Sequence, residues 1–148
     1  MGRYMMRLLA LTAAASALLA GSASAELSPA VAAPYLHIQA ALAGDSIEGV
    51  AEAAEAVAAA AAELGDTGAA IVTAARAVAL ADDLTKARAA FGLLSDAVIG
   101  YAREVGLGEL RLAFCPMARK SWIQEDGFIS NPYHGSEMLD CGSFRGLR

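Results

Sequence analysis

The stretch DDLTKARAAFGLLSDAVIGYAREV, residues 82–105, carries the clearest secondary-structure signal in this chain of 148 residues. Its apolar residues recur at alternating steps of three and four, which places them along one side of an α-helix. Asp82 or Asp83 can cap the start of this helix, and Gly106 can end it. The apolar face consists of Leu84, Ala87, Phe91, Leu94, Val98, Tyr101 and Val105.

Three further helices, all rich in alanine, are predicted upstream. The first covers 29–43, and Pro34 either kinks it or marks a later start. The second covers 45–64 and opens with an aspartate that forms a near capping box with Glu48. The third is shorter and covers 68–80. Four amphipathic helices with short connections favour a mainly α fold, an antiparallel four-helix bundle.

The last part of the chain, residues 106–148, differs in composition from the helical part. It holds five of the nine aromatic residues, which is too much apolar surface for a disordered tail. We expect a short strand at 110–114, a small hairpin that pairs 122–124 with 127–129, and a final helical turn at 136–142. The sequence therefore predicts a small, irregular C-terminal cap packed on the bundle.

Residues 1–25 have the layout of a signal peptide. Two arginines precede an apolar run at 8–20, and ASA at 23–25 is a small-x-small cleavage site. An uncleaved anchor is the alternative, but the apolar run is shorter than the roughly 18–20 residues that span a bilayer. We therefore expect cleavage to release one helical-bundle domain, residues 26–148, which is periplasmic or secreted and does not associate with the membrane.

Charge and motif content exclude several classes of function. The formal net charge is −5, which argues against nucleic acid or an anionic membrane surface as a partner. The chain lacks His-Glu-x-x-His, phosphate-loop and Cys-x-x-Cys spacings, and a lone cysteine nucleophile would have no identifiable base. We expect a protein that is not an enzyme.

The two cysteines of the chain each lie close to a methionine in this C-terminal part. Cys115 and Met117 are two residues apart, and Met138 and Cys141 are three residues apart. If the two segments meet, two thiolates and two thioethers converge, and His134 can add a nitrogen. Soft donors of this kind select Cu(I) or Ag(I) over hard ions. The sequence therefore suggests a metal site, with Cu(I) as the bound ion.

Other interpretations of these residues stay open. In an oxidising compartment two lone cysteines usually pair, so a Cys115–Cys141 disulfide is the main alternative, and two unpaired buried thiols are a third. Met117 and Met138 can simply fill the core, and His134 can be an exposed loop side chain. Under the disulfide interpretation the protein is a stapled helical interaction module without metal. A reduced metal-loaded form and an oxidised empty form can also interconvert.

The arrangement of these residues resembles a helical domain of exported bacterial proteins whose function is unknown. That domain occurs alone and as an appended module of membrane-fusion adaptors in Cus-type copper/silver efflux systems. Two upstream stretches, 35–45 and 87–97, also resemble the domain, the second through an Arg-x-x-Phe-x-x-Leu-Ser pattern. The matching C-terminal residues are Cys115-Pro116-Met117, Trp122, Asn131-Pro132-Tyr133, Gly135, Met138-Leu139 and Cys141-Gly142.

The resemblance covers nearly all of the chain after residue 25, with two departures. The stretch between Met117 and Trp122 is shorter than in many members, and His134 stands where members often have an aromatic residue. The resemblance implies metal handling in the periplasm and a copper/silver efflux adaptor, or another periplasmic protein, as the partner.

Overall fold

The computed structural model of the protein describes residues 26–147, so the predicted signal peptide lies outside the described residues. This part of the chain is mainly helical, as predicted, and ends in a small antiparallel sheet. In the described range no helix is both long and apolar enough to cross a membrane. The elements are α1 (Pro29–Ala43), α2 (Val50–Ala62), η1 (Gly65–Gly68), α3 (Ala69–Ala79), α4 (Leu84–Val105), β1 (Arg111–Cys115), β2 (Lys120–Gln124), η2 (Gly135–Glu137) and β3 (Ser143–Arg145).

The ends of α1 and α4 follow the local capping chemistry that the sequence predicts. The Ser28 hydroxyl accepts a hydrogen bond from the Ala30 amide at 3.3 Å, and α1 runs without interruption through Pro34. The Asp83 carboxylate accepts one from the Lys86 amide at 2.8 Å, so Asp83 is the cap of α4. These contacts satisfy amide groups that a helix start leaves without partners.

The predicted start of the second helix is wrong. Asp45 does not cap it, because its backbone has a positive φ of 56° and its carboxylate bonds to Arg88 instead. The helix begins only at Val50, after Gly49, and Glu48 does not form the predicted capping box. A tertiary ion pair has therefore replaced a local cap, and the connection between α1 and α2 is longer than the sequence suggests.

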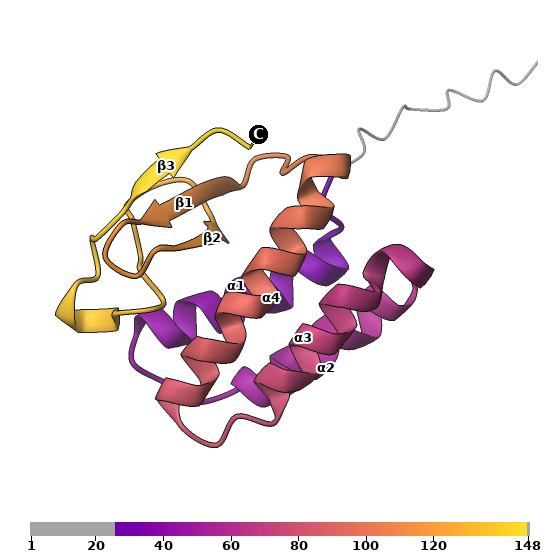
Figure 1. Ribbon diagram of the computed structural model, residues 1–148, viewed down its shortest axis with the longest axis horizontal. Helices are drawn as coiled ribbons and strands as arrows, with labels where there is room; N and C mark the ends of the chain where they lie inside the picture. Colours follow the sequence, from indigo (N-terminus) through magenta and orange to yellow (C-terminus); the bar gives the residue numbers. More distant parts are fainter. Residues whose placement is uncertain (1–25, 148) are drawn as a thin grey trace, which may run out of the picture.

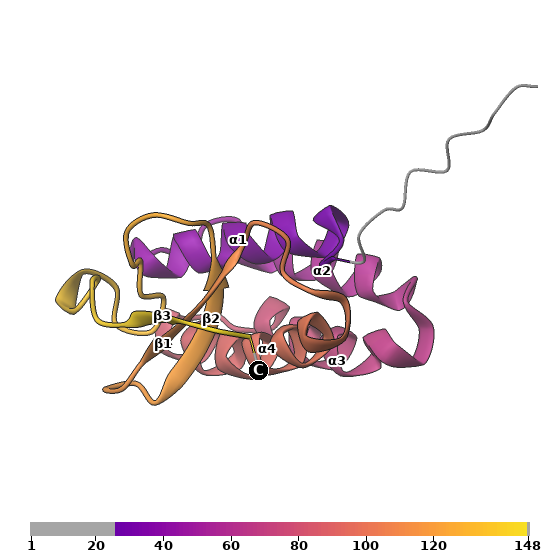
Figure 2. The same ribbon diagram turned by 90° about the horizontal axis from the view of Figure 1, so that it is seen from above.

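The four helices do not form a closed bundle. Neighbouring helices pack along the chain, α1 on α2, α2 on α3 and α3 on α4, whereas α1 and α4 contact each other little. Both of these helices contact β2 instead. Figure 1 shows the sheet on one side of α1 and α4, with α2 and α3 on the other side. From above, the strands run across α1 and α4 (Figure 2).

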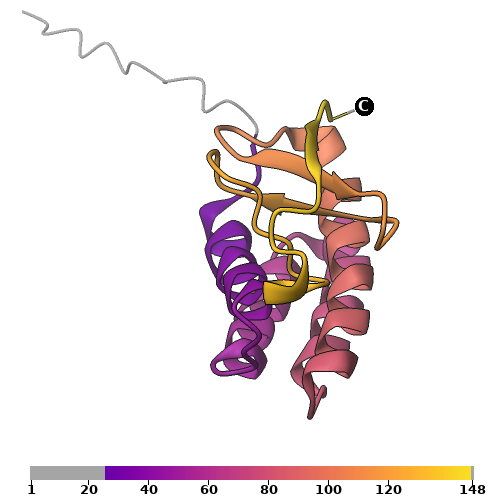
Figure 3. The ribbon, with the colours of Figure 1, turned by 90° about the vertical axis from the view of Figure 1, so that its left-hand side faces the viewer.

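The sheet occupies the place where a closed bundle would have joined α1 to α4. Figure 3 shows α1 and α4 on either side beneath the strands, with η2 between them. The four predicted helices are therefore present, but a regular four-helix bundle is not confirmed. The sheet fills the open side because β2, the edge strand next to the helices, carries large apolar residues, and Trp122 and Ile123 are both fully buried.

The predicted hairpin is in the wrong place. β2 pairs antiparallel with β1, with Ala113 opposite Trp122 and Cys115 opposite Lys120, and β3 pairs with the other edge of β1. The segment after β2 forms a loop and not a strand, because the Gln124 side chain donates to the Phe128 carbonyl at 2.8 Å and accepts from the Ser130 amide at 3.0 Å. These bonds occupy backbone groups that a second strand would need.

A buried hydroxyl group links α1, α4 and β2. The Tyr35 hydroxyl lies 2.7 Å from the Ser95 hydroxyl and accepts a hydrogen bond from the Ile123 amide at 3.1 Å. Tyr35 and Ser95 are fully buried, and the Tyr35 ring packs on Phe91 with ring centroids 5.1 Å apart. Burial raises the pKa of Tyr35 well above its ordinary value, so the hydroxyl stays protonated and can donate.

We predict that Tyr35→Phe lowers the free energy of unfolding by about 1–3 kcal/mol, because the Ser95 hydroxyl and the Ile123 amide lose a buried partner. Urea denaturation of the mature chain measures this. Tyr101→Phe, at a half-buried position of α4, is the matched control and should change stability much less. Equal effects of the two changes would contradict the role assigned to the Tyr35 hydroxyl.

Candidate functional site

The structure brings Cys115 and Cys141 together. Cys115 is the last residue of β1, and Cys141 lies just before β3, which pairs with β1 so that Phe114 is opposite Ser143. This register carries the Cys141 segment past the end of β1. The two Sγ atoms are 2.7 Å apart, and both cysteines are free thiols. The sequence prediction that the two sulfur-bearing segments meet therefore describes the fold correctly.

The two thiols have different surroundings. Cys115 is fully buried, which opposes its ionisation, but its sulfur accepts hydrogen bonds from the Ala118 amide, at 3.3 Å, and from Cys141. Together with the Met117 amide and the Asn131 side chain, these donors outweigh burial and hold the pKa of the Cys115 thiol below its usual value. Donation to Cys115 raises the pKa of the Cys141 thiol, and burial adds to the effect. Of the two thiols, Cys115 is therefore the one that loses its proton more readily.

Asn131 holds the Cys141 segment in place. Its side chain is fully buried and donates to the Cys141 carbonyl at 2.8 Å, while its carbonyl oxygen accepts from the Tyr133 amide at 2.8 Å and the His134 amide at 3.3 Å. Its own amide donates to the Leu139 carbonyl at 2.8 Å. One side chain thus closes a loop of ten residues whose end presents the second thiol.

Aromatic packing fixes the same loop against the sheet. The Trp122 ring is fully buried and lies edge-on to Tyr133, with ring centroids 6.0 Å apart. The Tyr133 hydroxyl donates to the Ser121 carbonyl at 2.6 Å. Gly142 lies so close to the Trp122 ring that a Cβ atom there would be 2.9 Å from a ring carbon. Because no side chain fits at 142 without displacement, the glycine after Cys141 lets the thiol segment approach β1.

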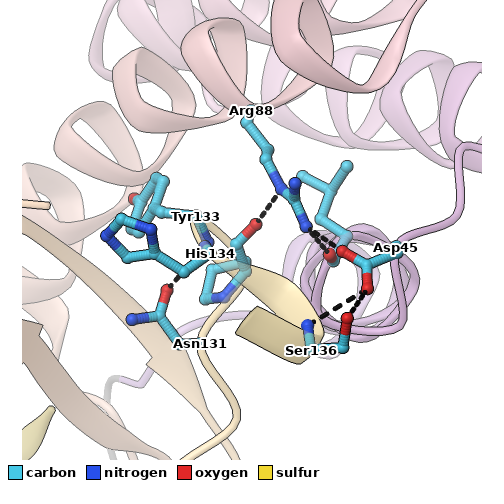
Figure 4. A network of polar contacts seen from close by, with 8 residues as sticks. Asp45, Arg88, Asn131, Tyr133, His134 and Ser136 are labelled. Atoms are coloured by element: carbon cyan, nitrogen blue, oxygen red, sulfur yellow. Dashed lines mark hydrogen bonds and ion pairs between the residues drawn. The ribbon is translucent and has the colours of Figure 1, made fainter. Parts of the chain in front are cut away.

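A polar network ties the start of this loop to the helices (Figure 4). Arg88 of α4 donates to the Pro132 carbonyl at 2.8 Å, to the Leu42 carbonyl at 2.9 Å and to the Asp45 carboxylate at 2.6 Å. The other oxygen of Asp45 accepts from the amide and the hydroxyl of Ser136. A Cβ on Gly135, whose φ is 56°, would collide with both Asp45 and Arg88, so this position requires glycine.

The two methionines that the sequence predicts as ligands differ in exposure. The Met117 side chain is 68% exposed and extends into solvent. Met138 is half-buried and adjoins Cys141 through the main chain, since its carbonyl accepts from the Cys141 amide at 3.0 Å. The backbone at Met138 is not helical, with φ −148° and ψ 55°, so the predicted helical turn over 136–142 is wrong: only the short η2 forms.

His134 has one ring nitrogen without a hydrogen-bond partner in the described residues. Its Nε2 atom is buried and makes no hydrogen bond there. No group of three or more His, Cys, Asp or Glu side chains that could hold a metal ion occurs in residues 26–147. His134 therefore does not complete a three-ligand cluster with the two cysteines in this arrangement.

The thiol pair fits a soft metal ion only after a small opening. A metal held between two sulfurs at metal–sulfur distances of roughly 2.3 Å needs the sulfurs up to about 4.5 Å apart. The observed separation is 2.7 Å, so one sulfur must move outward. Cys141 is the one that can move, because it is partly exposed and lies in a loop, whereas Cys115 is buried at a strand end.

Sequence reasoning missed Asn131, Arg88, Asp45 and Ser136 as residues that position the thiols. In the sequence, Asn131 stands out only as a residue of the resemblance, although an asparagine before a proline is the kind of residue that bonds nearby backbone groups. Arg88 and Asp45 are 43 residues apart in sequence and become partners only in the folded chain. No local pattern marks such a pair.

Comparison of the chain with protein-family models, with curated protein sequences and with solved structures finds no match.

We predict that acid weakens the attachment of the loop through Asp45. The hydrogen bonds from Ser136 and Arg88 lower the pKa of Asp45 to about 2. Because the folded-state pKa is depressed, this contribution is present above the unfolded pKa near 3.8 and is lost as the pH falls toward 2. The difference in urea midpoint between wild type and Asp45→Asn should therefore be largest at neutral pH and shrink between pH 4 and pH 2.

The control for this measurement is Asp66→Asn, in the exposed η1 segment. A gap between wild type and Asp45→Asn that stays constant over the whole acid range would contradict the assignment.

Proposed function

We propose that the protein is an exported, periplasmic protein that binds a soft metal ion, Cu(I) or Ag(I), and serves metal efflux or resistance. The observation that carries the proposal is the thiol pair, with the sulfurs of Cys115, at the end of β1, and Cys141, in the loop before β3, 2.7 Å apart. In this proposal the signal peptide at 1–25 exports the chain, and the four helices act as an antiparallel bundle that supports the site. A copper/silver efflux adaptor is the proposed partner.

The electrostatics of the pair support a metal ligand set. Metal ions bind the thiolate form of cysteine, and the amide donors around Cys115 already favour that form. Loss of the thiol protons of both cysteines gives a two-sulfur set. Sulfur ligands select Cu(I) over hard ions. In this proposal the ion is bound tightly and takes no part in proton transfer.

The methionines and the histidine complete the proposed set. Met138 adjoins Cys141 through a backbone hydrogen bond of 3.0 Å, and Met117 follows Cys115 in the exposed turn of the hairpin. The buried Nε2 of His134 makes no hydrogen bond within the described chain, so it can bind the ion in this scheme. In this scheme the two thiolates hold the ion, and Met117, Met138 or His134 adds a third donor after the loop adjusts.

We expect reduced protein to bind one Cu(I), and Cys115→Ser or Cys141→Ser to weaken the binding by a factor of at least about 100, because a two-sulfur site loses one of its thiolates. Anaerobic titration against a competing Cu(I) chelator measures the affinity. Met117→Leu, Met138→Leu and His134→Asn test the third donor and should each cost less than a cysteine. Unchanged affinity in the double variant Cys115→Ser/Cys141→Ser would remove the proposal.

A second candidate function, a disulfide-stapled interaction module without metal, is favoured by a different surface. A hollow of about 470 Å³ lies between α1 and the loop after β2, and an adjoining hollow of about 460 Å³ shares Ala33 and Leu36 with it. Phe128, at the edge, is 98% exposed. Four carboxylates surround the two hollows, those of Glu26, Glu109, Glu125 and Asp126.

Charge complementarity selects the occupant of this surface. Acidic groups around an apolar hollow fit a basic peptide segment that also carries apolar side chains, and the exposed Phe128 ring can receive a cation or an apolar group. In this function the thiols are cross-linked and only stabilise the cap.

A fluorescent amphipathic peptide of lysine and leucine is the probe for this surface. We expect Phe128→Ser and the pair Glu125→Gln/Asp126→Asn each to weaken its binding by about tenfold, and the binding to fall with added salt. Leu93→Ser, at an exposed site on α4, is the matched control. Equal binding by all variants would exclude this surface. A thiol assay on protein purified without reductant separates the two functions, because blocked thiols and indifference to Cu(I) favour the second.

A further inference from the structure

The two sulfurs of the pair differ in access as well as in proton affinity. Cys115 has no exposed surface, and its sulfur is enclosed by the Ala118 amide and by Cys141 itself. Cys141 is partly exposed and precedes β3, a short edge strand. A reagent that arrives from solvent therefore meets Cys141 first.

We propose that Cys141 is the site at which a disulfide, either a small molecule or an oxidoreductase, reacts with the reduced protein, and that Cys115 then displaces the adduct to form the Cys115–Cys141 bond. This inference concerns the thiol pair of the proposed function and adds its regulation. It assigns entry to the exposed sulfur and resolution to the buried one.

The exchange balances as two displacements. When the pair carries a single proton, Cys141 attacks one sulfur of the incoming disulfide RSSR as this proton passes to the Cys115 sulfur 2.7 Å away, which gives a Cys141–S–SR adduct, a Cys115 thiol and RS⁻. The released RS⁻ takes the proton from Cys115. The Cys115 thiolate then attacks Sγ of Cys141 and expels a second RS⁻. The protein thiols are oxidised to one disulfide, and RSSR is reduced to RSH and RS⁻.

The geometry favours this order over the reverse. An adduct on Cys115 would have to fit R inside the enclosure formed by the amide donors and the β1 end, where no exposed surface exists. An adduct on Cys141 can extend into solvent while its sulfur stays beside Cys115. The second displacement is then intramolecular and needs no large movement of the chain.

Metal binding and the cross-link exclude one another. The ion needs the two sulfurs about 4.5 Å apart, whereas the disulfide brings them to about 2.05 Å. Exchange with an external disulfide would therefore release a bound ion, and a bound ion would slow the exchange. From the observed 2.7 Å, the Cys141 sulfur moves outward to admit the ion and inward to form the cross-link.

The test uses metal-free, reduced mature protein and the uncharged probe bis(2-hydroxyethyl) disulfide, followed by intact mass spectrometry. In wild type we expect direct conversion to a form that has lost two hydrogen atoms, with little adduct. In Cys115→Ser we expect the adduct on Cys141 to accumulate. In Cys141→Ser we expect adduct formation to be at least roughly tenfold slower, because the remaining sulfur is buried.

Repeating the reaction in urea controls for access, since both single variants should then react at similar rates. Cys115→Ala, with circular dichroism to verify the fold, replaces Cys115→Ser if the latter unfolds. Equal or faster reaction of folded Cys141→Ser, or a lasting adduct in wild type, would overturn the assignment. Because no metal is present, failure of the Cu(I) titration leaves this result unaffected, and failure here leaves the titration unaffected.

Discussion

The Tyr35 hydroxyl is the contact on which the arrangement of the other parts depends. It bridges Ser95 on α4 and the Ile123 amide of β2 from its place on α1, and all three groups are buried. A buried amide without a partner is costly, so β2 can lie between α1 and α4 only where this hydroxyl meets it. The sheet is thereby fixed on the open side of the helices, and the end of β1 is fixed with it.

Hydrogen bonds and packing contacts of the surrounding loop hold the thiol pair in place more than the interaction between the two sulfurs does. Arg88 and Asp45 anchor the start of the loop, Asn131 closes it, and Gly142 allows it to pass the Trp122 ring. In this chain they act mainly as scaffold, since they place Cys141 beside Cys115 and do not reach the sulfurs with charged groups.

The two neighbouring sulfurs therefore differ in burial and in pKa. Amide donors lower the pKa of the buried Cys115 thiol, and donation to Cys115 raises the pKa of the more exposed Cys141 thiol. A fixed sulfur paired with a movable one suits both a metal ion and a reversible cross-link, because only the loop has to adjust. A helical bundle without the sheet would offer no strand end to hold the fixed partner.

Local sequence patterns specify two of the helices. Apolar residues at steps of three and four, with Ser28 and Asp83 as caps, specify α1 and α4 almost to the residue, because these signals act within one or two turns. The clustering of sulfur also indicated the candidate site, although the thiols alone met closely and His134 did not join them.

Contacts between distant parts of the chain set the start of α2, the strand that pairs with Lys120–Gln124 and the attachment of the C-terminal cap. Asp45 and Gln39 find their partners 43 and 91 residues away, in Arg88 and Ser130. Gln124 prevents the expected hairpin by bonding the loop that follows it. Such contacts compete with local preferences and win because they satisfy groups buried by the folded chain, which no short stretch of sequence can specify.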